Sequence, residues 1–210
     1  MVLGEKMKFK LFFLFLTLYL IGIFFSLHSE FRYIVIWMIL SSATLSVAYI
    51  EDKPNFILGK KENGEINIYL LILNFPWLVF TWTIFRVQMF VSQENIVDHV
   101  KGTKIYISSR PLNGFDFSSY NVIVDLTAEF LKDEVINQKY ICYSNLDGMP
   151  LTNSYNDINI FAKKTILVHC ANGHRRSALF VAQLLLDLGL VQTFAEGVER
   201  VKKSRPLAKV

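Results

Sequence analysis

The chain has 210 residues, 52% of them hydrophobic, and a formal net charge of +4 at pH 7. The apolar residues are concentrated in about the first 90 positions, so the composition excludes one soluble domain that spans the whole chain. Basic and acidic residues are nearly balanced in both halves, which excludes a nucleic-acid-binding surface. With only 2 cysteines, the chain has no disulfide framework of the kind found in oxidising compartments.

Two uncharged apolar stretches, residues 11–27 and 33–50, predict a pair of transmembrane helices. Each is long enough to cross a hydrocarbon core of about 30 Å, and the short link between them requires an antiparallel hairpin. The lysines before the first stretch also suit a signal peptide, but its apolar core is too long and no small-residue cleavage site follows. The alternative is a buried helical hairpin of a soluble protein, which the length and the absence of charge disfavour.

A third apolar segment, residues 66–90, completes a predicted membrane region of residues 1–91. Pro76 lies near its middle, and aromatic side chains, which prefer the membrane–water interface, are spread along it. Polar residues recur every seven positions on one helical face: Asn67, Asn74, Thr81 and Gln88. These features predict a broken, interfacial or re-entrant segment, although its length also permits a crossing.

The lysines that flank the two spans predict how the protein lies in the membrane. Three precede the first span and three follow the second: Lys6, Lys8, Lys10, Lys53, Lys60 and Lys61. Because basic residues are enriched in cytoplasmic loops, we expect both flanks in the cytoplasm. If the third segment does not cross, the rest of the chain lies on the cytoplasmic face of an integral membrane protein; if it crosses, that part lies outside.

The remaining residues, 92–210, predict an α/β domain. Apolar runs indicate strands at residues 104–107, 121–127, 139–143 and 165–168. Helix-length or helically spaced segments cover residues 154–162, 176–188 and 194–203. Strands that alternate with helices imply a sheet covered by helices. Asp125 and Glu129 lie near a strand end and are interpreted as structural caps at a strand-to-helix junction.

The last predicted strand leads into a loop with a cysteine six residues before an arginine. Cys170 ends the strand and Arg176 begins a helix, so the amides between them would wrap around an anion at the helix N-terminus. The intervening loop residues are Ala171, Asn172, Gly173, His174 and Arg175. The pattern predicts a phosphate-binding catalytic loop.

Each remaining position of this loop suits phosphoryl chemistry. The helix field, His169 and the two arginines favour a nucleophilic thiolate at Cys170. Arg176 can hold two oxygens of a phosphoryl group, and Ser177 is placed to hydrogen-bond the sulfur as it leaves. A lone Cys-x5-Arg is weak evidence, since cysteines often end buried strands, but the joint pattern H-C-x2-G-x2-R-S is rare by chance.

At these residues the sequence resembles the cysteine-dependent protein tyrosine phosphatase superfamily, in its dual-specificity branch. The resemblance implies a metal-independent phosphoric monoester hydrolase without a cofactor. It also implies a general acid on a loop upstream of the cysteine, for which Asp147 in the sequence Leu-Asp-Gly-Met-Pro is the candidate. A catalytic thiolate needs reducing conditions, which favours the cytoplasmic face. The alternative reading is a catalytically silent phosphate-binding scaffold at the membrane.

His174 and Arg175 make the loop unusually basic, because many relatives have small residues at these positions. Their charge predicts attraction to a polyanion or a lipid headgroup, and the alternative is that they only keep the loop soluble. The expected partners are a phosphorylated protein or an anionic phospholipid as substrate, and membrane lipid. Cys142 could capture an oxidised Cys170, although a buried structural cysteine is the favoured reading.

Overall fold

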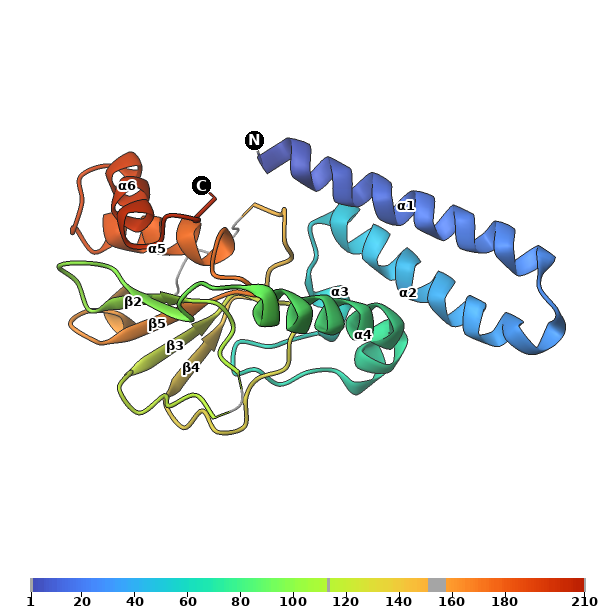
Figure 1. Cartoon of the computed structure of the whole chain (residues 1–210), viewed down its shortest axis with the longest axis horizontal. Coiled ribbons are helices and arrows are strands. Elements are labelled where there is room, and N and C mark those ends of the chain that lie inside the picture. The colour runs from blue at the N-terminus through green and yellow to red at the C-terminus, as the bar shows by residue number, and fades with distance from the viewer. Residues whose placement is uncertain (1, 113, 151–157, 210) are drawn as a thin grey trace.

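The sheet domain contains five strands in the order β1-β2-β5-β3-β4 (Figure 1). The computed structural model describes residues 2–112, 114–150 and 158–209. The strands are β1 (Val97–His99), β2 (Ile105–Ser108), β3 (Val122–Asp125), β4 (Lys139–Cys142) and β5 (Ile166–His169). β1 is antiparallel to β2 and the other pairs are parallel. All residues of β3 and β5 are buried, as expected for parallel strands covered on both faces.

The parallel strands end together at one edge of the sheet, and the predicted catalytic loop leaves from this edge. Their registers align Ser108 with His169, and Asp125 with both His169 and Cys142. Ligands of open α/β sheets bind outside the carboxyl ends of the strands. Strand pairing therefore brings together polar residues that lie far apart in the sequence.

Two helices complete the predicted α/β architecture. α5 (Arg176–Asp187) buries one side on the sheet, and α6 (Phe194–Ser204) packs against α5. A Cβ on Gly197 would lie 2.6 Å from the Ala182 carbonyl oxygen, so this close contact requires glycine. Within the predicted helix at residues 154–162 the structure shows only a short 3-10 turn, Ile158–Ile160, and residues 154–157 lie outside the described part.

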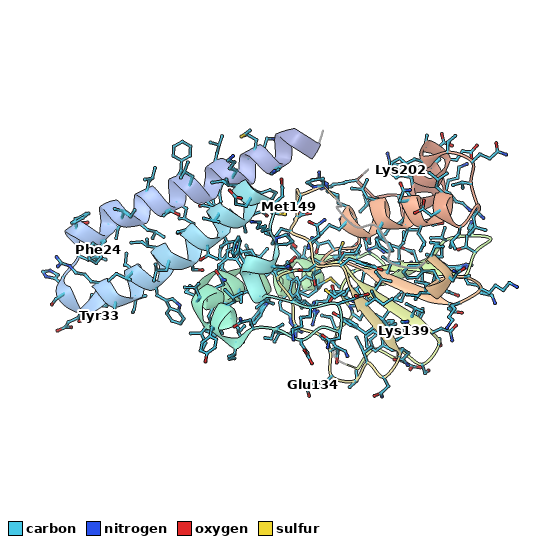
Figure 2. The ribbon with its side chains drawn as sticks, turned by 180° about the vertical axis from the view of Figure 1, so that it is seen from behind. Phe24, Tyr33, Glu134, Lys139, Met149 and Lys202 are labelled. Atoms are coloured by element: carbon cyan, nitrogen blue, oxygen red, sulfur yellow. The ribbon has the colours of Figure 1, made fainter. Side chains whose placement is uncertain are left out.

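The helical hairpin is formed as predicted and projects away from the sheet domain (Figure 1). It consists of α1 (Val2–Ser26) and α2 (Arg32–Glu51), with a short 3-10 turn, Ser29–Phe31, between them. Large apolar side chains are exposed along both helices, and Phe24 and Tyr33 lie near the far tip (Figure 2). By length and composition α1, α2 and α4 (Ile68–Val91) can each cross a membrane.

The third apolar segment is one continuous helix, so of the broken, interfacial and re-entrant forms that the sequence predicted, the broken form is wrong. Proline cannot donate the usual backbone hydrogen bond to the carbonyl four residues earlier, here that of Ile72. The Trp37 indole nitrogen, from α2, donates to the Ile72 oxygen at 2.9 Å instead. The carbonyl that the proline leaves without its helical partner is therefore satisfied, and α4 continues.

The polar face of α4 points toward the protein. Asn67 caps the helix by accepting from the Tyr69 backbone nitrogen, and Asn74 is buried and donates to the Phe56 and Ile57 carbonyls of α3 (Asn55–Leu58). The opposite face exposes large apolar side chains, among them Tyr69, Phe80 and Phe90. This distribution of residues suits a helix with one face toward lipid.

The link between α3 and α4 is part of the sheet domain. The Lys60 ammonium is buried and donates to the Asp125 carboxylate at 2.6 Å and to the carbonyls of Thr127 and Phe130. The Cys142 backbone nitrogen donates to the Glu62 carbonyl. Burial alone would raise the pKa of Asp125, but the charge of Lys60 holds it well below its usual value.

Asp125 and Glu129 are not helix caps, because the described residues between β3 and β4 contain no helix. Asp125 accepts from the backbone nitrogen and hydroxyl of Thr127, which stabilises the irregular segment after β3. The Glu129 carboxylate accepts from the Arg176 guanidinium. The sequence-based interpretation of both acids as caps is therefore wrong.

Candidate active site

The segment between β5 and α5 folds into a tight loop around the Cys170 sulfur. The Gly173 backbone nitrogen donates to the sulfur at 3.2 Å, and the Ser177 hydroxyl lies 3.4 Å from it. Gly173 has a φ of +72°, and a Cβ at this position would lie 2.7 Å from the backbone of Ser108 and Ser109. The loop therefore needs glycine for its conformation and for its contact with the end of β2.

Arg176 is the most strongly constrained side chain of the site. It is 4% exposed, and its guanidinium donates to both carboxylate oxygens of Glu129, at 2.7 and 3.0 Å. It also donates to the carbonyls of Leu126 and Asn145. Burial opposes its charge, but Glu129 outweighs burial and raises the pKa of Arg176. The guanidinium is thus fixed as a cation beside Cys170.

The candidate acid lies at the same site. One carboxylate oxygen of Asp147 is 3.9 Å from Nε of Arg176, and its side chain is 57% exposed. The Tyr49 hydroxyl, from α2, donates to the Asp147 carbonyl oxygen at 3.0 Å. The structure therefore brings Asp147, Cys170 and Arg176 together, and a residue of the helical hairpin holds the loop that carries the candidate acid.

His169 does not supply positive charge to the site. Burial lowers the pKa of its imidazole to about 4, against the opposing effect of Asp125, so the ring is neutral at pH 7. Its Nδ1 lies 3.8 Å from the Asp125 carboxylate. The positive charge expected from His169 is therefore absent, and the groups that face the Cys170 sulfur are the Gly173 amide and the Ser177 hydroxyl at the start of α5.

The outer half of the loop is tied to the start of the sheet domain. His174 lies 2.6 Å from the Glu94 carboxylate, which Arg205 also contacts at 3.3 Å. Arg205 donates to the Asn172 carbonyl, and the Asn172 side chain donates to Gln88 of α4. His174 is thus engaged by Glu94, which disfavours the alternative that it only keeps the loop soluble.

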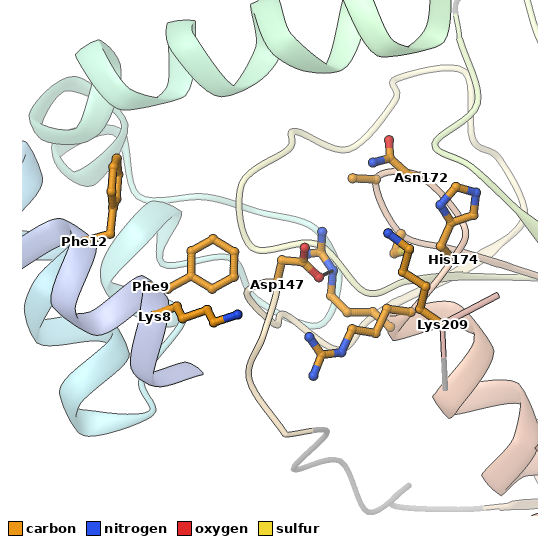
Figure 3. Close-up of a pocket in the computed structure, with 11 residues that line it drawn as sticks. Lys8, Phe9, Phe12, Asp147, Asn172, His174 and Lys209 are labelled. Carbon is orange, nitrogen blue, oxygen red and sulfur yellow. Dashed lines mark ion pairs between the residues drawn. The ribbon is translucent and has the colours of Figure 1, made fainter. Parts of the chain in front are cut away.

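The loop opens into a cavity of about 530 Å³ that the sequence alone did not predict (Figure 3). Loop residues form its floor, and Asp147 lies at its side. α1 contributes three side chains, Lys8, Phe9 and Phe12, and Lys209 approaches from the C-terminal tail. Lys8 and Phe9 point from α1 toward Asp147 (Figure 3). The cavity is therefore built jointly by the helical hairpin and the sheet domain.

Cys142 lies too far away to form a disulfide with Cys170. Cys142 on β4 and His169 on β5 both pair with Asp125, so two strand spacings separate them. At about 4.8 Å per spacing, Cys142 and His169 are about 10 Å apart, and Cys170 directly follows His169. A disulfide needs less than about 7 Å between Cα atoms. Burial raises the pKa of the Cys142 thiol to about 12, as expected for a core residue.

The donor set is suited to an anion rather than to a metal ion. Within residues 2–112, 114–150 and 158–209 there is no group of three or more His, Cys, Asp or Glu side chains that could hold a metal. The cavity instead combines the cations Lys8, Arg176 and Lys209 with a helix N-terminus. A phosphate group would meet the Cys170 sulfur and the Asp147 carboxylate in one place.

Comparison with known proteins finds similarity in structure only: no protein family and no curated protein matches the sequence. Human DUSP28 has 14% identity and a TM-score of 0.42, covering 55% of this chain and 85% of its own. A mouse putative dual specificity phosphatase complexed with zinc tungstate has 14% identity and a TM-score of 0.44, covering 57% and 84%. The human tyrosine phosphatase-like serine/threonine/tyrosine-interacting protein has 16% identity and a TM-score of 0.39, covering 54% and 86%.

These solved structures are of the class that the loop motif resembles. Their similarity is distant and concerns the fold, so the function is argued below from the site itself. The structure also adds residues that sequence reasoning missed: Glu129, Tyr49, Lys8, Phe9, Phe12 and Lys209. None of them belongs to a local motif, because each reaches the site from a distant segment.

The geometry of the loop predicts different effects for two glycine substitutions. Gly173→Ala and Gly189→Ala both place a side chain at positive φ, which costs about 1–2 kcal/mol. Only Gly173→Ala also collides with backbone, since a Cβ at Gly189 has nothing within 4 Å. We expect Gly173→Ala to weaken orthovanadate binding by about 10²-fold, the cost of misplacing a site by about 1 Å. Gly189→Ala should retain vanadate affinity in the same titration, and equal losses would contradict this role of Gly173.

Proposed function

We propose that the protein is a membrane-anchored, cysteine-dependent phosphatase that hydrolyses phosphate monoesters through a phosphocysteine. The observation that carries this proposal is the buried Arg176. Its guanidinium is fixed by Glu129 and lines the same cavity as Cys170. A guanidinium so held matches the equatorial oxygens of a transferring phosphoryl group. The Gly173 amide and the N-terminus of α5 stabilise negative charge on the attacking sulfur.

The reaction then has two steps. The Cys170 thiolate attacks phosphorus, the bond to the leaving oxygen breaks, and Asp147 donates a proton to that oxygen. In the second step Asp147 takes a proton from water, the water oxygen attacks phosphorus, and the sulfur–phosphorus bond breaks. Ser177, 3.4 Å from the sulfur, can donate to the departing thiolate. The products are an alcohol and inorganic phosphate, and the thiolate is restored.

A catalytically silent phosphate-binding scaffold is the second candidate function. It would need the cations and loop amides but neither a thiol nor an acid at the anion site. Cys170 and Asp147 both face the cavity, and Tyr49 positions the acid loop. This arrangement favours catalysis over binding alone.

We further propose that the sheet domain lies on the cytoplasmic face of the membrane. Lys8 lines the cavity beside the sheet domain, and Lys6 and Lys10 lie within two residues of it in the first turns of α1. Basic residues favour the cytoplasmic side. The exposed apolar face of α4 supports a position of this helix at the membrane interface, beside the sheet domain. A reducing compartment also keeps Cys170 active.

The first test removes the nucleophile. Cys170→Ser should abolish hydrolysis of an aryl phosphate, because a hydroxyl does not ionise at neutral pH and cannot replace the thiolate. Release of inorganic phosphate is measured for the full-length protein in detergent, with Cys142→Ser as the matched control that retains activity. Full activity of Cys170→Ser, or a requirement for an added divalent metal, would contradict the mechanism.

The second test concerns the acid. Asp147→Asn should slow hydrolysis of alkyl phosphates by about 10²–10⁴-fold, the usual contribution of a positioned acid. Aryl phosphates with acidic leaving groups should lose much less, since their departing oxygen needs no proton. The measurement compares kcat for the two substrate kinds in the variant and the wild type, and equal losses would show that another group donates the proton.

A further inference from the structure

The first turns of α1 form one wall of the active-site cavity. Lys8, Phe9 and Phe12 line it opposite the Cys170 loop, and Lys8 extends toward Asp147 (Figure 3). These residues lie in the first turns of a candidate membrane span, Lys6–Ser26. A substrate phosphate in the loop therefore lies beside the point where α1 changes from charged to apolar.

A second cavity lies along the hairpin and shares the lining residue Phe12 with the first. It has a volume of about 310 Å³, within the range of small-molecule sites. We call it the apolar groove; its lining side chains come from α1, α2 and α4: Phe12, Phe13, Leu16, Leu20, Met38, Ser41, Ser42, Leu45, Pro76, Trp77 and Phe80. From Phe12 to Leu20 the groove follows α1 for about 12 Å at 1.5 Å per residue.

The two cavities are arranged in the order of the parts of a lipid. Cations and the phosphate loop come first, Phe12 follows at the junction, and the apolar groove then runs toward the far tip of the hairpin. A lipid phosphate at a membrane surface has the same order, with its headgroup at the interface and its chain toward the interior. A phosphopeptide would instead place polar backbone groups in the groove, where they would lack hydrogen-bond partners.

Ser41 is a wall residue of the apolar groove that can be replaced without the loss of a hydrogen bond. Ser41 is 2% exposed, and its hydroxyl has no hydrogen-bond partner among the described residues. The neighbouring Ser42, by contrast, is hydrogen-bonded to Thr17 and to the Ile39 carbonyl. A larger side chain at position 41 would fill the groove without removing a hydrogen bond.

We propose that the substrate is a lipid phosphate monoester whose hydrocarbon chain occupies the apolar groove while its phosphate enters the Cys170 loop. This inference rests on the proposed phosphatase activity and names its substrate class. Lys8 contacts the headgroup, and Phe12 contacts the first part of the chain. The membrane hairpin is then part of the substrate site as well as an anchor.

The experiment uses butyl phosphate and octyl phosphate with the full-length protein in phosphatidylcholine nanodiscs. Both substrates have a primary alkoxide leaving group, so their intrinsic chemistry is the same and the ratio of their kcat/KM values reports chain binding. Burial of one methylene is worth about 0.8 kcal/mol, or roughly fourfold in rate constant. Four added methylenes should therefore favour octyl phosphate by up to about 10²-fold.

Variants separate groove binding from simple partition into the bilayer. Ser41→Phe fills the groove and should lower the octyl-to-butyl ratio at least tenfold, and Phe12→Ala should lower it as well if Ser41→Phe fails to fold. Phe15→Ala is the matched control, since Phe15 is 63% exposed on α1 and lines neither cavity. Lys8→Gln should lower kcat/KM for both substrates about fivefold, from about 1 kcal/mol per basic residue, and Lys10→Gln should not.

The outcomes distinguish this inference from the proposed function. A ratio near one in the wild type, or a high ratio that persists in both Ser41→Phe and Phe12→Ala, would overturn the lipid inference while aryl phosphate hydrolysis leaves the phosphatase standing. An unchanged rate in Lys8→Gln would contradict the headgroup contact. If the wild type hydrolyses no phosphate monoester at all, aryl phosphate included, the proposed function fails, and the inference fails with it.

Discussion

The pairing of Arg176 with Glu129 is the interaction on which the rest of the site depends. A guanidinium that is 4% exposed needs a charged partner, and breaking a buried pair by removing one member costs about 3–5 kcal/mol. The Glu129 backbone is itself held, because the Trp82 indole of α4 donates to its carbonyl at 2.8 Å. The segment that carries Glu129 is anchored by Lys60. The position of Arg176 is therefore stabilised by α4 and by the link between α3 and α4.

Each apolar helix thus contributes to the site in a different way. α4 holds Glu129 through Trp82, α2 holds the acid loop through Tyr49, and α1 walls the cavity with Lys8 and Phe12. A sheet domain without α1, α2 and α4 would lose all of these contacts. The physical consequence is that the three apolar helices and the Cys170 loop form one structural unit.

The sequence predicts the local features of this site and misses the distant ones. The strand before Cys170, the helix from Arg176 and the glycine between them follow from periodicity and spacing, because each depends on neighbours along the chain. The continuity of α4 through Pro76 could not be predicted, since it depends on an indole from another helix. Likewise, nothing near Glu129 in the sequence indicates a partner 47 residues away, and the neutrality of His169 follows from its burial in the folded protein.

The most direct test of a site that transfers phosphate to Cys170 is to trap the phosphorylated enzyme. The full-length protein is mixed with a ³²P-labelled aryl phosphate, quenched within the first turnover in detergent at alkaline pH, digested and mapped by mass spectrometry. The mechanism predicts a label that is stable in alkali and released in mild acid on the peptide that contains Cys170, and none in Cys170→Ser. Label on another residue, or release of phosphate with no labelled protein at any time, would contradict it.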